Sequence, residues 1–458
     1  MILGMITWLR CEEKCVLIFK YLFLFFTLII AQKTEVVISS INYENIKLQV
    51  DSLNNSHMTL SAEYHLSSFN FVKNQSIYQI SDSYKTADSL IFNGENIVNT
   101  HIKNTILDHY RYIPIGKEYL AIGKQLVSKY YFINEIPEYD FGLIGDEYLV
   151  SLITVDPNFN SYFTGSFGAS KNSKTLDFIG QIDLEIENLI GEAEQTKIFW
   201  KRDDILSQKI KINTFMPHFF RLPFGLEWEL NHELYRGLYT LKDQRLKFNV
   251  FIPFMSRFQL GYNWGEIIAT DLGIKNSFEN LSYEAFTIGT ELDTRNDRLQ
   301  PTDGKYFHLM VDGGQDKNSI FIKSSVDCHS FHQIVNNFYL KFGYFIRGIN
   351  YHNSIVPISR YTMIGGTNSL RGFEEEEFSS TQFQVLTLES IIQQSSLIQL
   401  KIFIDMGSDE INLFSENMFG YGFGINQVNQ NSIISVDYAI GNSKKPSSKI
   451  HIKWVTRF

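Results

Sequence analysis

Alternating apolar and polar side chains dominate residues 158–458 of this 458-residue chain. Such alternation is typical of β-strands whose two faces meet different surroundings, and turn-forming residues separate the successive stretches. We predict sixteen strands, which begin near Ser161, Leu176, Glu194, Gln208, Gly225, Tyr239, Ser256, Ser282, Lys305, Phe321, Phe338, Gln382, Leu397, Gly420, Ser432 and Lys449. An even number of antiparallel strands that closes on itself leaves no unpaired edge, as a lipid environment requires. The pattern therefore predicts a membrane all-β fold, a 16-stranded antiparallel transmembrane β-barrel over 158–458.

The final stretch alternates most clearly. One face carries Ile450, Ile452, Trp454 and Phe458, and the other carries His451, Lys453 and Arg457. A strand in a soluble sandwich also alternates, but this apolar face continues nearly to the end of the chain. In residues 397–407 the even-numbered positions are apolar, so Asp405 is predicted to face the lumen of the barrel. The same reasoning turns Asp293 inward.

Two regions and a leader precede the predicted barrel. Basic residues precede an apolar stretch at 21–31, which is typical of an export signal, and we predict a signal peptide over 1–31. The alternative is a short membrane anchor, but eleven residues are too few to span a bilayer. Region 32–86 is polar, with short strands predicted at 35–40, 46–50 and 56–64, and its fold stays open.

Residues 87–157 have the pattern of one small α+β unit. A strand at 89–92 is followed by apolar residues at helical spacing over 97–107 and 117–129. Two further strands, 138–144 and 147–155, flank a Gly-Asp turn signal and are predicted to form a hairpin. The order is βααββ, and about 70 residues are enough for such a unit to fold by itself.

Composition favours a β-rich protein and argues against several functions. Aromatic residues make up 15% of the chain, and only 9 prolines occur. These values fit a soluble β-rich protein as well as a membrane barrel with aromatic girdles. The net charge of −9 and the lack of a basic stripe argue against nucleic acid as a partner. Outside the leader the only cysteine is Cys328, and no metal, phosphate or nucleophile motif is found, so neither a cofactor nor an enzyme activity is predicted.

A glycine-rich segment interrupts the strands between 350 and 380. It reads Gly365-Gly366-Thr367-Asn368-Ser369-Leu370-Arg371-Gly372-Phe373. A loop tip in water has little need for a Leu, a Phe and several glycines around one arginine. We interpret the segment as a loop that folds back into an enclosed space. A four-glutamate run at 374–377 follows it, and is either a solvated face or a docking surface for nearby basic residues.

Three motifs in this order resemble the bacterial surface antigen family. Asp293 and Arg295, followed by Pro301 and Gly304, resemble its D-x-R…P-x-x-G signature. Gly365 and Gly366 with Arg371, Gly372 and Phe373 resemble its R-G-F loop, and residues 403–407 resemble its F-x-D-x-G strand. The superfamily contains outer-membrane assembly factors of the BamA and TamA type and two-partner secretion transporters. By this resemblance 87–157 is a POTRA-like domain, 32–86 is an exported region or a degenerate POTRA domain, and Trp454 and Phe458 belong to a C-terminal barrel signal.

The resemblance and the strand parity together predict which side chain Arg371 binds. A guanidinium inside a narrow lumen needs a carboxylate, because an unpaired buried charge is very costly. Asp405 faces inward by parity, so we predict an Arg371–Asp405 ion pair that locks the folded-in loop. The resemblance adds Glu389 as a second carboxylate, although alternation would then turn Phe383 and Val385 inward as well. The alternative is that Arg371 is a solvated loop arginine.

The D-x-R…P-x-x-G residues have two interpretations as well. Asp293 and Arg295 are charges of the kind that catalytic sites use, but we favour a structural role. In that role they organise the turn after the eighth strand, and Pro301 and Gly304 shape it.

The resemblance implies a non-enzymatic assembly factor that helps other proteins enter the outer membrane. A POTRA-like domain in the periplasm would capture unfolded clients by strand addition, and the barrel would aid their insertion. The implied partners are the outer-membrane lipid bilayer, unfolded outer-membrane or secreted protein clients, and periplasmic accessory proteins. The alternative is a two-partner secretion pore, which passes a protein through its lumen. A passive porin ranks below both, because it needs neither a POTRA-like domain nor an R-G-F loop.

Overall fold

A computed structural model describes most of the chain after the predicted leader. The described residues are 35–39, 45–49, 52, 64–70, 72–73, 75–80, 86–95, 97–115, 117–144, 148–171, 176–252, 256–317, 319–395, 397–410, 418–429, 431–442 and 448–458. The predicted signal peptide and the Gly-Asp turn at 145–146 lie outside these residues. Within the described part of the chain, no helix is both long and apolar enough to cross a membrane.

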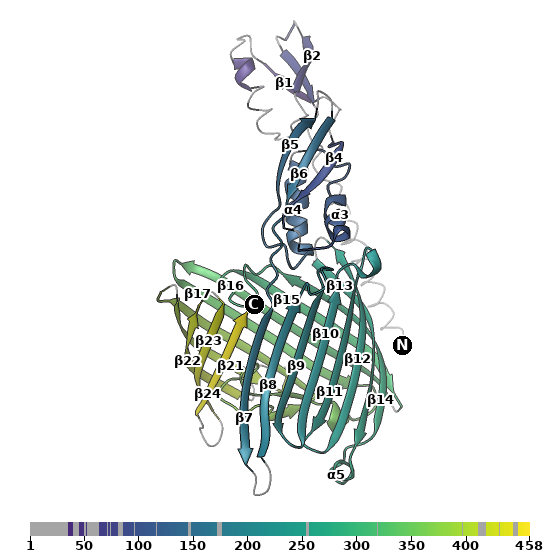
Figure 1. Ribbon diagram of the computed structural model, residues 1–458, viewed down its shortest axis with the longest axis vertical. Helices are drawn as coiled ribbons and strands as arrows, with labels where there is room; N and C mark the ends of the chain where they lie inside the picture. The colour runs from purple at the N-terminus through teal and green to yellow at the C-terminus, as the bar shows by residue number, and fades with distance from the viewer. Residues whose placement is uncertain are drawn as a thin grey trace, which may run out of the picture. The chain divides into compact units, whose positions relative to one another are not determined.

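Sixteen antiparallel strands close into a barrel (Figure 1), which confirms the predicted fold class. They are β7 (Tyr162–Lys171), β8 (Leu176–Glu187), β9 (Gln195–Asp204), β10 (Ser207–Met216), β11 (Gly225–Tyr235), β12 (Tyr239–Ile252), β13 (Ser256–Ala269), β14 (Leu281–Asp293), β15 (Gly304–Asp316), β16 (Ile320–Val335), β17 (Phe338–Tyr351), β20 (Gln382–Gln393), β21 (Ile398–Ser408), β22 (Met418–Val428), β23 (Ser432–Gly441) and β24 (Ser448–Arg457). Each begins within two residues of its predicted start.

Strand parity separates an apolar outer face from a polar lumen. In β21 the side chains of Ile402 and Ile404 are exposed, whereas Lys401, Phe403 and Asp405 are buried inside. Ile402 is 65% exposed and Asp405 only 1%, so the two faces of this strand differ as the alternation predicts. An outer face of this kind is what a barrel presents to lipid, because apolar side chains cost nothing there.

Two ends of the barrel are distinguished by the chain itself. At the proximal end the chain enters β7 and leaves β24, and the turn 294–303 joins β14 to β15. The opposite, distal end carries the short helix α5 (Asp271–Lys275) and the long connection 352–381 between β17 and β20. That connection contains a small hairpin of β18 (Thr362–Ile364) and β19 (Phe378–Ser380), and its tip is the glycine-rich segment.

One junction between neighbouring strands is much shorter than the others. β24 pairs with β7 through only three residue pairs, Val455 with Thr164, Thr456 with Phe163 and Arg457 with Tyr162. Elsewhere in the barrel, neighbouring strands share between 8 and 14 pairs. We call the β24–β7 junction the seam. Across it, described residues 165–171 and 448–454 have no partner on the opposite strand, so both strands keep unpaired backbone edges.

The described residues before the barrel form two three-stranded sheets. The first unit after residue 86 runs β4 (Ser89–Asn93), α3 (Thr100–Asp108), α4 (Lys117–Lys129), β5 (Glu138–Ile144) and β6 (Tyr148–Thr154). Its order along the chain is the predicted βααββ, and its sheet has the order β4-β6-β5. Buried side chains of the two helices, Ile102, Ile106 and Leu126 among them, contribute to its core.

The second sheet lies in the region whose fold the sequence left open. It contains β1 (Glu35–Ile38), β2 (Tyr64–Asn70) and β3 (Gln75–Ile80) in the order β1-β3-β2. The strand predicted at 46–50 is wrong, because residues 45–49 are helical. Alternation over five residues is too short to separate the two periods, and Lys47, Leu48 and Gln49 are good helix formers. The predicted strand 56–64 lies outside the described residues except for Tyr64, which begins β2.

The outward face of β21 provides a test of the lipid-facing assignment. We expect Ile402→Lys to cost about 2–4 kcal/mol of folding free energy, because the ammonium would lie in hydrocarbon. Urea unfolding of the protein in phospholipid bilayers measures this cost. The matched control is Asn426→Lys on the neighbouring strand β22, where the side chain lines a lumenal cavity. An equal loss in both variants would contradict the assignment of the two faces.

Candidate functional site

The guanidinium of Arg371 lies inside the barrel and is held by a fork of hydrogen bonds. Its Nε donates to Oδ2 of Asp405 at 2.8 Å, and its Nη2 donates to Oδ1 at 2.9 Å. Its Nη1 donates to Oε2 of Glu389 at 3.0 Å, and its backbone N–H also reaches Asp405, at 3.1 Å. The structure thus brings together the three residues that the sequence singled out, with Arg371 only 8% exposed.

Three further charged groups, Asp437, Lys401 and Lys341, complete this cluster, and the sequence did not single them out. Oδ2 of Asp437, on β23, lies 3.6 Å from Nη1 of Arg371, and its Oδ1 lies 2.7 Å from the ammonium of Lys401. Lys341 lies 4.0 Å from Glu389. Three cations therefore face three carboxylates, so the buried charges balance, as they must in a poorly solvated lumen. The inward parity of Asp437, opposite the exposed Val436, was a signal available in the sequence.

Aromatic and apolar side chains surround the charges. The Cζ atom of Arg371 lies 3.5 Å from the ring centre of Phe403, which gives a cation–π contact, while the carboxylates accept from the N–H groups of the guanidinium. Leu370 and Phe373, on either side of the Arg-Gly pair, pack with Phe383 and Val385 of β20. Phe383 and Val385 have the same parity as Glu389, so an inward Glu389 required two apolar side chains to point inward as well. They point inward because the loop fills this part of the lumen with apolar side chains of its own.

Gly372 allows the loop tip to approach the barrel wall. Its φ of +93° lies in the region that favours glycine, and an added Cβ would lie 2.7 Å from backbone atoms of Ile440 and Gly441 on β23. From the other side, a Cβ at Gly420 of β22 would lie 2.0 Å from the carbonyl oxygen of Arg371. Any side chain at either position would therefore push the tip away from the wall. Gly365 and Gly366 also have positive φ, at +128° and +88°.

The acidic run after the loop docks on basic side chains instead of forming only a solvated face. Three of its carboxylates lie near lysines: Glu374 at 3.0 Å from Lys449 on β24, Glu375 at 3.8 Å from Lys201 on β9, and Glu376 at 3.7 Å from Lys209 on β10. These strands lie on both sides of the seam. The carboxylates of Glu374 and Glu375 are 74% and 44% exposed, so each of their pairs adds little stability.

A second anchor holds the start of the loop, and no sequence motif marked it. The guanidinium of Arg360 lies 3.6 Å from the ring centre of Tyr283 and 4.6 Å from that of Phe321. Both rings belong to a buried cluster that also includes Val356 of the loop. The loop is therefore fixed near its first residues by aromatic contacts and at its tip by ion pairs.

The D-x-R…P-x-x-G residues form the turn between β14 and β15. Arg295 donates from Nε and Nη2 to the two oxygens of Asp293, at 2.8 and 2.6 Å. Gly304 has a φ of +102°, and an added Cβ would lie 2.2 Å from the carbonyl oxygen of Thr294, so only glycine fits this crossing. Pro301 lies in the same turn and lines a lumenal cavity. Arg295 also lies with its Cζ atom 4.8 Å from the ring centre of Tyr306, within the same hairpin.

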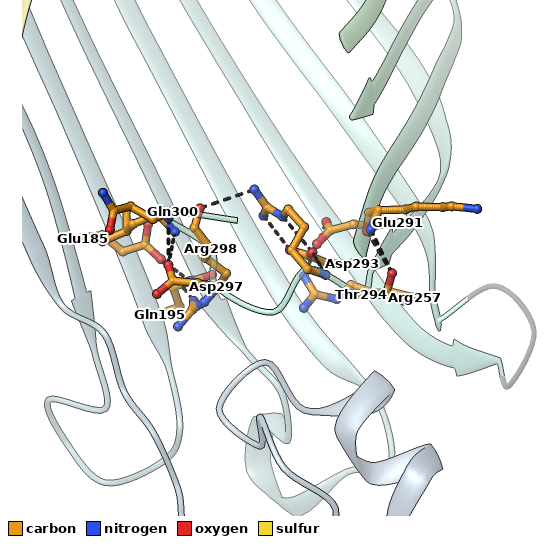
Figure 2. Close-up of polar contacts among 12 residues, drawn as sticks. Glu185, Gln195, Arg257, Glu291, Asp293, Thr294, Asp297, Arg298 and Gln300 are labelled. Atoms are coloured by element: carbon orange, nitrogen blue, oxygen red, sulfur yellow. Dashed lines mark hydrogen bonds and ion pairs between the residues drawn. The ribbon is translucent and has the colours of Figure 1, made fainter. Parts of the chain in front are cut away.

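The same turn carries two charged residues that the sequence did not single out. Arg298 donates from Nη1 and Nη2 to the carboxylate of Glu187 on β8, at 2.5 and 3.0 Å, and Glu185 lies nearby (Figure 2). Asp297 accepts two hydrogen bonds from Nη2 of Arg457 on β24, at 3.1 and 3.0 Å. The partners are distant in sequence, and the turn reaches them only because it bends into the barrel.

A cavity of about 410 Å³ lies in the lumen between the loop tip and this turn. Arg371, Glu389 and Asp405 line it on one side, and Arg295 and Arg298 line it on the other. The two residues of the predicted C-terminal barrel signal do not line this cavity. Trp454 and Phe458 are 52% and 68% exposed, on the outer side of β24 and at its end.

The site holds a loop in place and offers little for covalent chemistry. Among the described residues, no group of three His, Cys, Asp or Glu side chains is arranged to hold a metal ion. The carboxylates of the Arg371 cluster are paired with cations. The arrangement is mechanical: it fixes a long loop to β20, β21 and β23 at once.

Comparisons with known proteins give one family and several structures that share the fold. The Omp85 superfamily domain matches residues 188–454, which is more than half of the chain. BamA from Haemophilus ducreyi, lacking POTRA domains 1–3, aligns over 92% of this chain and 94% of its own, at 12% identity and a TM-score of 0.53. CdiB from Escherichia coli aligns over 91% and 85%, at 12% identity and a TM-score of 0.61. CdiB from Acinetobacter baumannii aligns over 91% and 82%, at 13% and 0.58. Identities this low show a shared fold only, and no curated protein matches the chain.

The Arg371 cluster predicts strong coupling between two substitutions. Arg371→Ala alone leaves Asp405 and its neighbours without their main cation, and we expect it to cost about 3–5 kcal/mol of stability. Asp405→Ala in that background should cost much less than it does alone, with a coupling energy of about 0.5–3 kcal/mol. Denaturant unfolding in detergent micelles of the two single variants and the double variant measures this coupling.

The control for this cycle is Arg347→Ala, which removes an ion pair in the barrel wall where Nη2 of Arg347 donates to both carboxylate oxygens of Asp327. Combined with Asp405→Ala, it should give additive losses, because the two sites share no partner. Additive losses for Arg371 and Asp405 would contradict the ion pair as the fixing contact of the loop.

Proposed function

Because the chain belongs to the Omp85 superfamily, we propose that it is an outer-membrane assembly factor that inserts client proteins through its seam. Members of this superfamily act on protein clients in the outer membrane, as insertion factors or as secretion transporters. Insertion is the function that the geometry supports best. Its mechanism requires no bond chemistry, only a controlled opening between two strands and a source of strand edges.

The observation that carries this proposal is the shortness of the seam. A lipid-embedded barrel normally pairs every backbone N–H and C=O group, because an unsatisfied group costs several kcal/mol in hydrocarbon. At the seam, three residue pairs join β24 to β7, and both strands continue with unpaired edges. Such edges are templates for another strand. A client strand that pairs with β24 or β7 would satisfy these groups and enter the bilayer sideways.

The lumenal loop supports insertion at the seam over passage through the lumen. Arg371 ties the loop tip to strands on one side of the barrel, and the acidic run reaches strands on both sides of the seam. A protein that crossed through the lumen would have to displace this loop and break the balanced charge cluster. A protein that enters at the seam need not break it. In this mechanism Arg371, Asp405 and Glu389 are the lock that keeps the loop in place.

The unit at 87–157 supports a role in client capture. Its βααββ order and its β4-β6-β5 sheet leave β4 and β5 as the two edges. An extended client segment could add to such an edge by backbone hydrogen bonds, with little demand on its sequence. The solved structures align over 91–92% of the chain, more than the barrel alone provides, which supports a POTRA-like fold for this region. We place it in the periplasm.

Two-partner secretion remains the second candidate because of one observation. The β1-β3-β2 sheet repeats the first-third-second strand order of the β4-β6-β5 sheet. Two POTRA-like domains before a barrel are typical of two-partner secretion transporters. The region 32–86 would then be a second, reduced domain of this kind. The two functions differ in whether the client passes through the seam or the lumen.

A disulfide across the seam separates the two functions. The pair Thr164→Cys and Val455→Cys, in a Cys328→Ser background, joins two residues that are register partners across the seam. If clients enter at the seam, oxidation should abolish complementation of a depleted strain, and proteomics should show a general loss of outer-membrane barrels. If the client passes through the lumen, secretion of one partner should continue.

The control places the same bond at an ordinary junction. Thr196→Cys with Thr214→Cys joins β9 to β10, where the two hydroxyl oxygens already lie 3.4 Å apart. Oxidation there should leave function unchanged. Full insertion by the oxidised seam variant would contradict the proposed function.

A further inference from the structure

We propose that the turn 294–303 is an internal clasp that holds the seam closed at its proximal end. Two consecutive residues of this turn, Asp297 and Arg298, carry opposite charges and bind opposite sides of the seam. The inference rests on the proposed function only in that a seam used by clients must open. It assigns a role to residues that neither the family motif nor the lumenal loop explains.

The side of β8 is held by Arg298. Both of its terminal nitrogens donate to the carboxylate of Glu187, the last residue of β8, whose side chain is 0% exposed. The same carboxylate accepts from the backbone N–H of Asn160, at 2.6 Å, and from the side-chain amide of Gln195. The Glu187 carboxylate, at the end of β8, therefore binds the entry to β7, the start of β9 and the guanidinium of Arg298.

The side of β24 is held by Asp297. Its carboxylate accepts two hydrogen bonds from Arg457, the last residue of β24 and the partner of Tyr162 in the seam. The backbone N–H groups of Leu299 and Gln300 donate to the same carboxylate, at 2.7 and 2.8 Å. Burial opposes ionisation, but the Gln300 amide, the charge of Arg457 and the Leu299 amide together hold the pKa of Asp297 below its usual value. The carboxylate is therefore charged at neutral pH.

The short pairing of the seam explains why a clasp is needed there. The two strands are joined directly by three residue pairs and one further bond. In that bond the N–H of Phe458 donates to the carbonyl oxygen of Ser161. All of them lie at the proximal end, next to the clasp. The turn adds a bridge from β24 through residues 297 and 298 to β8. Loss of that bridge would leave only these backbone bonds to keep the proximal end shut.

The contacts are unequal, and this sets the size of the expected effects. The Arg298–Glu187 pair is bidentate, and its carboxylate is buried. Loss of such charge-assisted bonds corresponds to about a tenfold change in the equilibrium constant for opening of the seam. The Asp297 carboxylate is 37% exposed, and solvent weakens its pair with Arg457. Loss of this pair should change the equilibrium constant for opening of the seam about threefold. Arg298 is therefore the stronger of the two attachments.

Hydrogen exchange of the full-length protein in lipid nanodiscs tests the clasp. Peptides that cover 160–166 and 450–458 report opening of the seam, and peptides from β16 and β17 report the rest of the wall. We expect Arg298→Gln to speed exchange in the seam peptides about tenfold. Asp297→Asn, which keeps an acceptor for the turn amides, and Arg457→Gln should each speed it about threefold.

The controls separate a clasp from general loss of stability. Arg347→Gln removes an ion pair between β17 and β16, in which one guanidinium nitrogen donates to both oxygens of Asp327, and should leave exchange in the seam peptides unchanged. Heat-modifiable gel mobility verifies that each variant still forms a barrel, and the combination of Asp297→Asn with Arg457→Gln should exchange no faster than either alone. Unchanged seam exchange in Arg298→Gln and Asp297→Asn would overturn the proposal, as would equal acceleration by Arg347→Gln.

This experiment does not depend on client insertion. If the seam disulfide left insertion intact while the clasp variants still opened the seam faster, the proposed function would fail and the clasp would stand. If oxidised seam variants lost insertion but seam exchange ignored the clasp variants, the proposed function would stand and the clasp would fail.

Discussion

The structure depends on one constraint, the need to pair backbone polar groups inside a lipid bilayer. The barrel meets this constraint at every junction except one, where β24 and β7 share three residue pairs. A soluble sheet can leave an edge to water, but a barrel in hydrocarbon cannot do so without cost. The acidic run of the lumenal loop and the charges of the turn 294–303 both contact strands on the two sides of this short junction.

Charge balance in the lumen follows from the same lack of solvent. Arg371, Lys401 and Lys341 face Glu389, Asp405 and Asp437, and the turn pairs Arg298 with Glu187 and Asp297 with Arg457. In both places the partners come from segments far apart in the sequence. Folding of the loop and the turn into the barrel is therefore tied to closure of the barrel, because neither set of charges is satisfied before the distant strands meet.

Much of this arrangement was predictable from the alternation of apolar and polar residues with a period of two. An error of one residue in register would have exchanged the inward and outward faces of a strand. The alternation located every strand of the barrel and turned Asp405 inward toward Arg371. It failed where the lumen is not polar, at Phe383 and Val385, because those side chains pack against the loop. It also failed for Asp297, Arg298 and Arg360, whose partners are set by how a turn or loop bends in three dimensions. No spacing in the sequence encodes such contacts.

The central claim is that a client meets this protein at the seam. A photo-activated cross-linker at Ile452 lies on the part of β24 that has no partner across the seam, and one at Asn426 lies on the wall of the lumenal cavity. With an outer-membrane barrel protein arrested during insertion, adducts should form from position 452 and stay at background from position 426. Adducts from position 426 without any from position 452 would contradict the account.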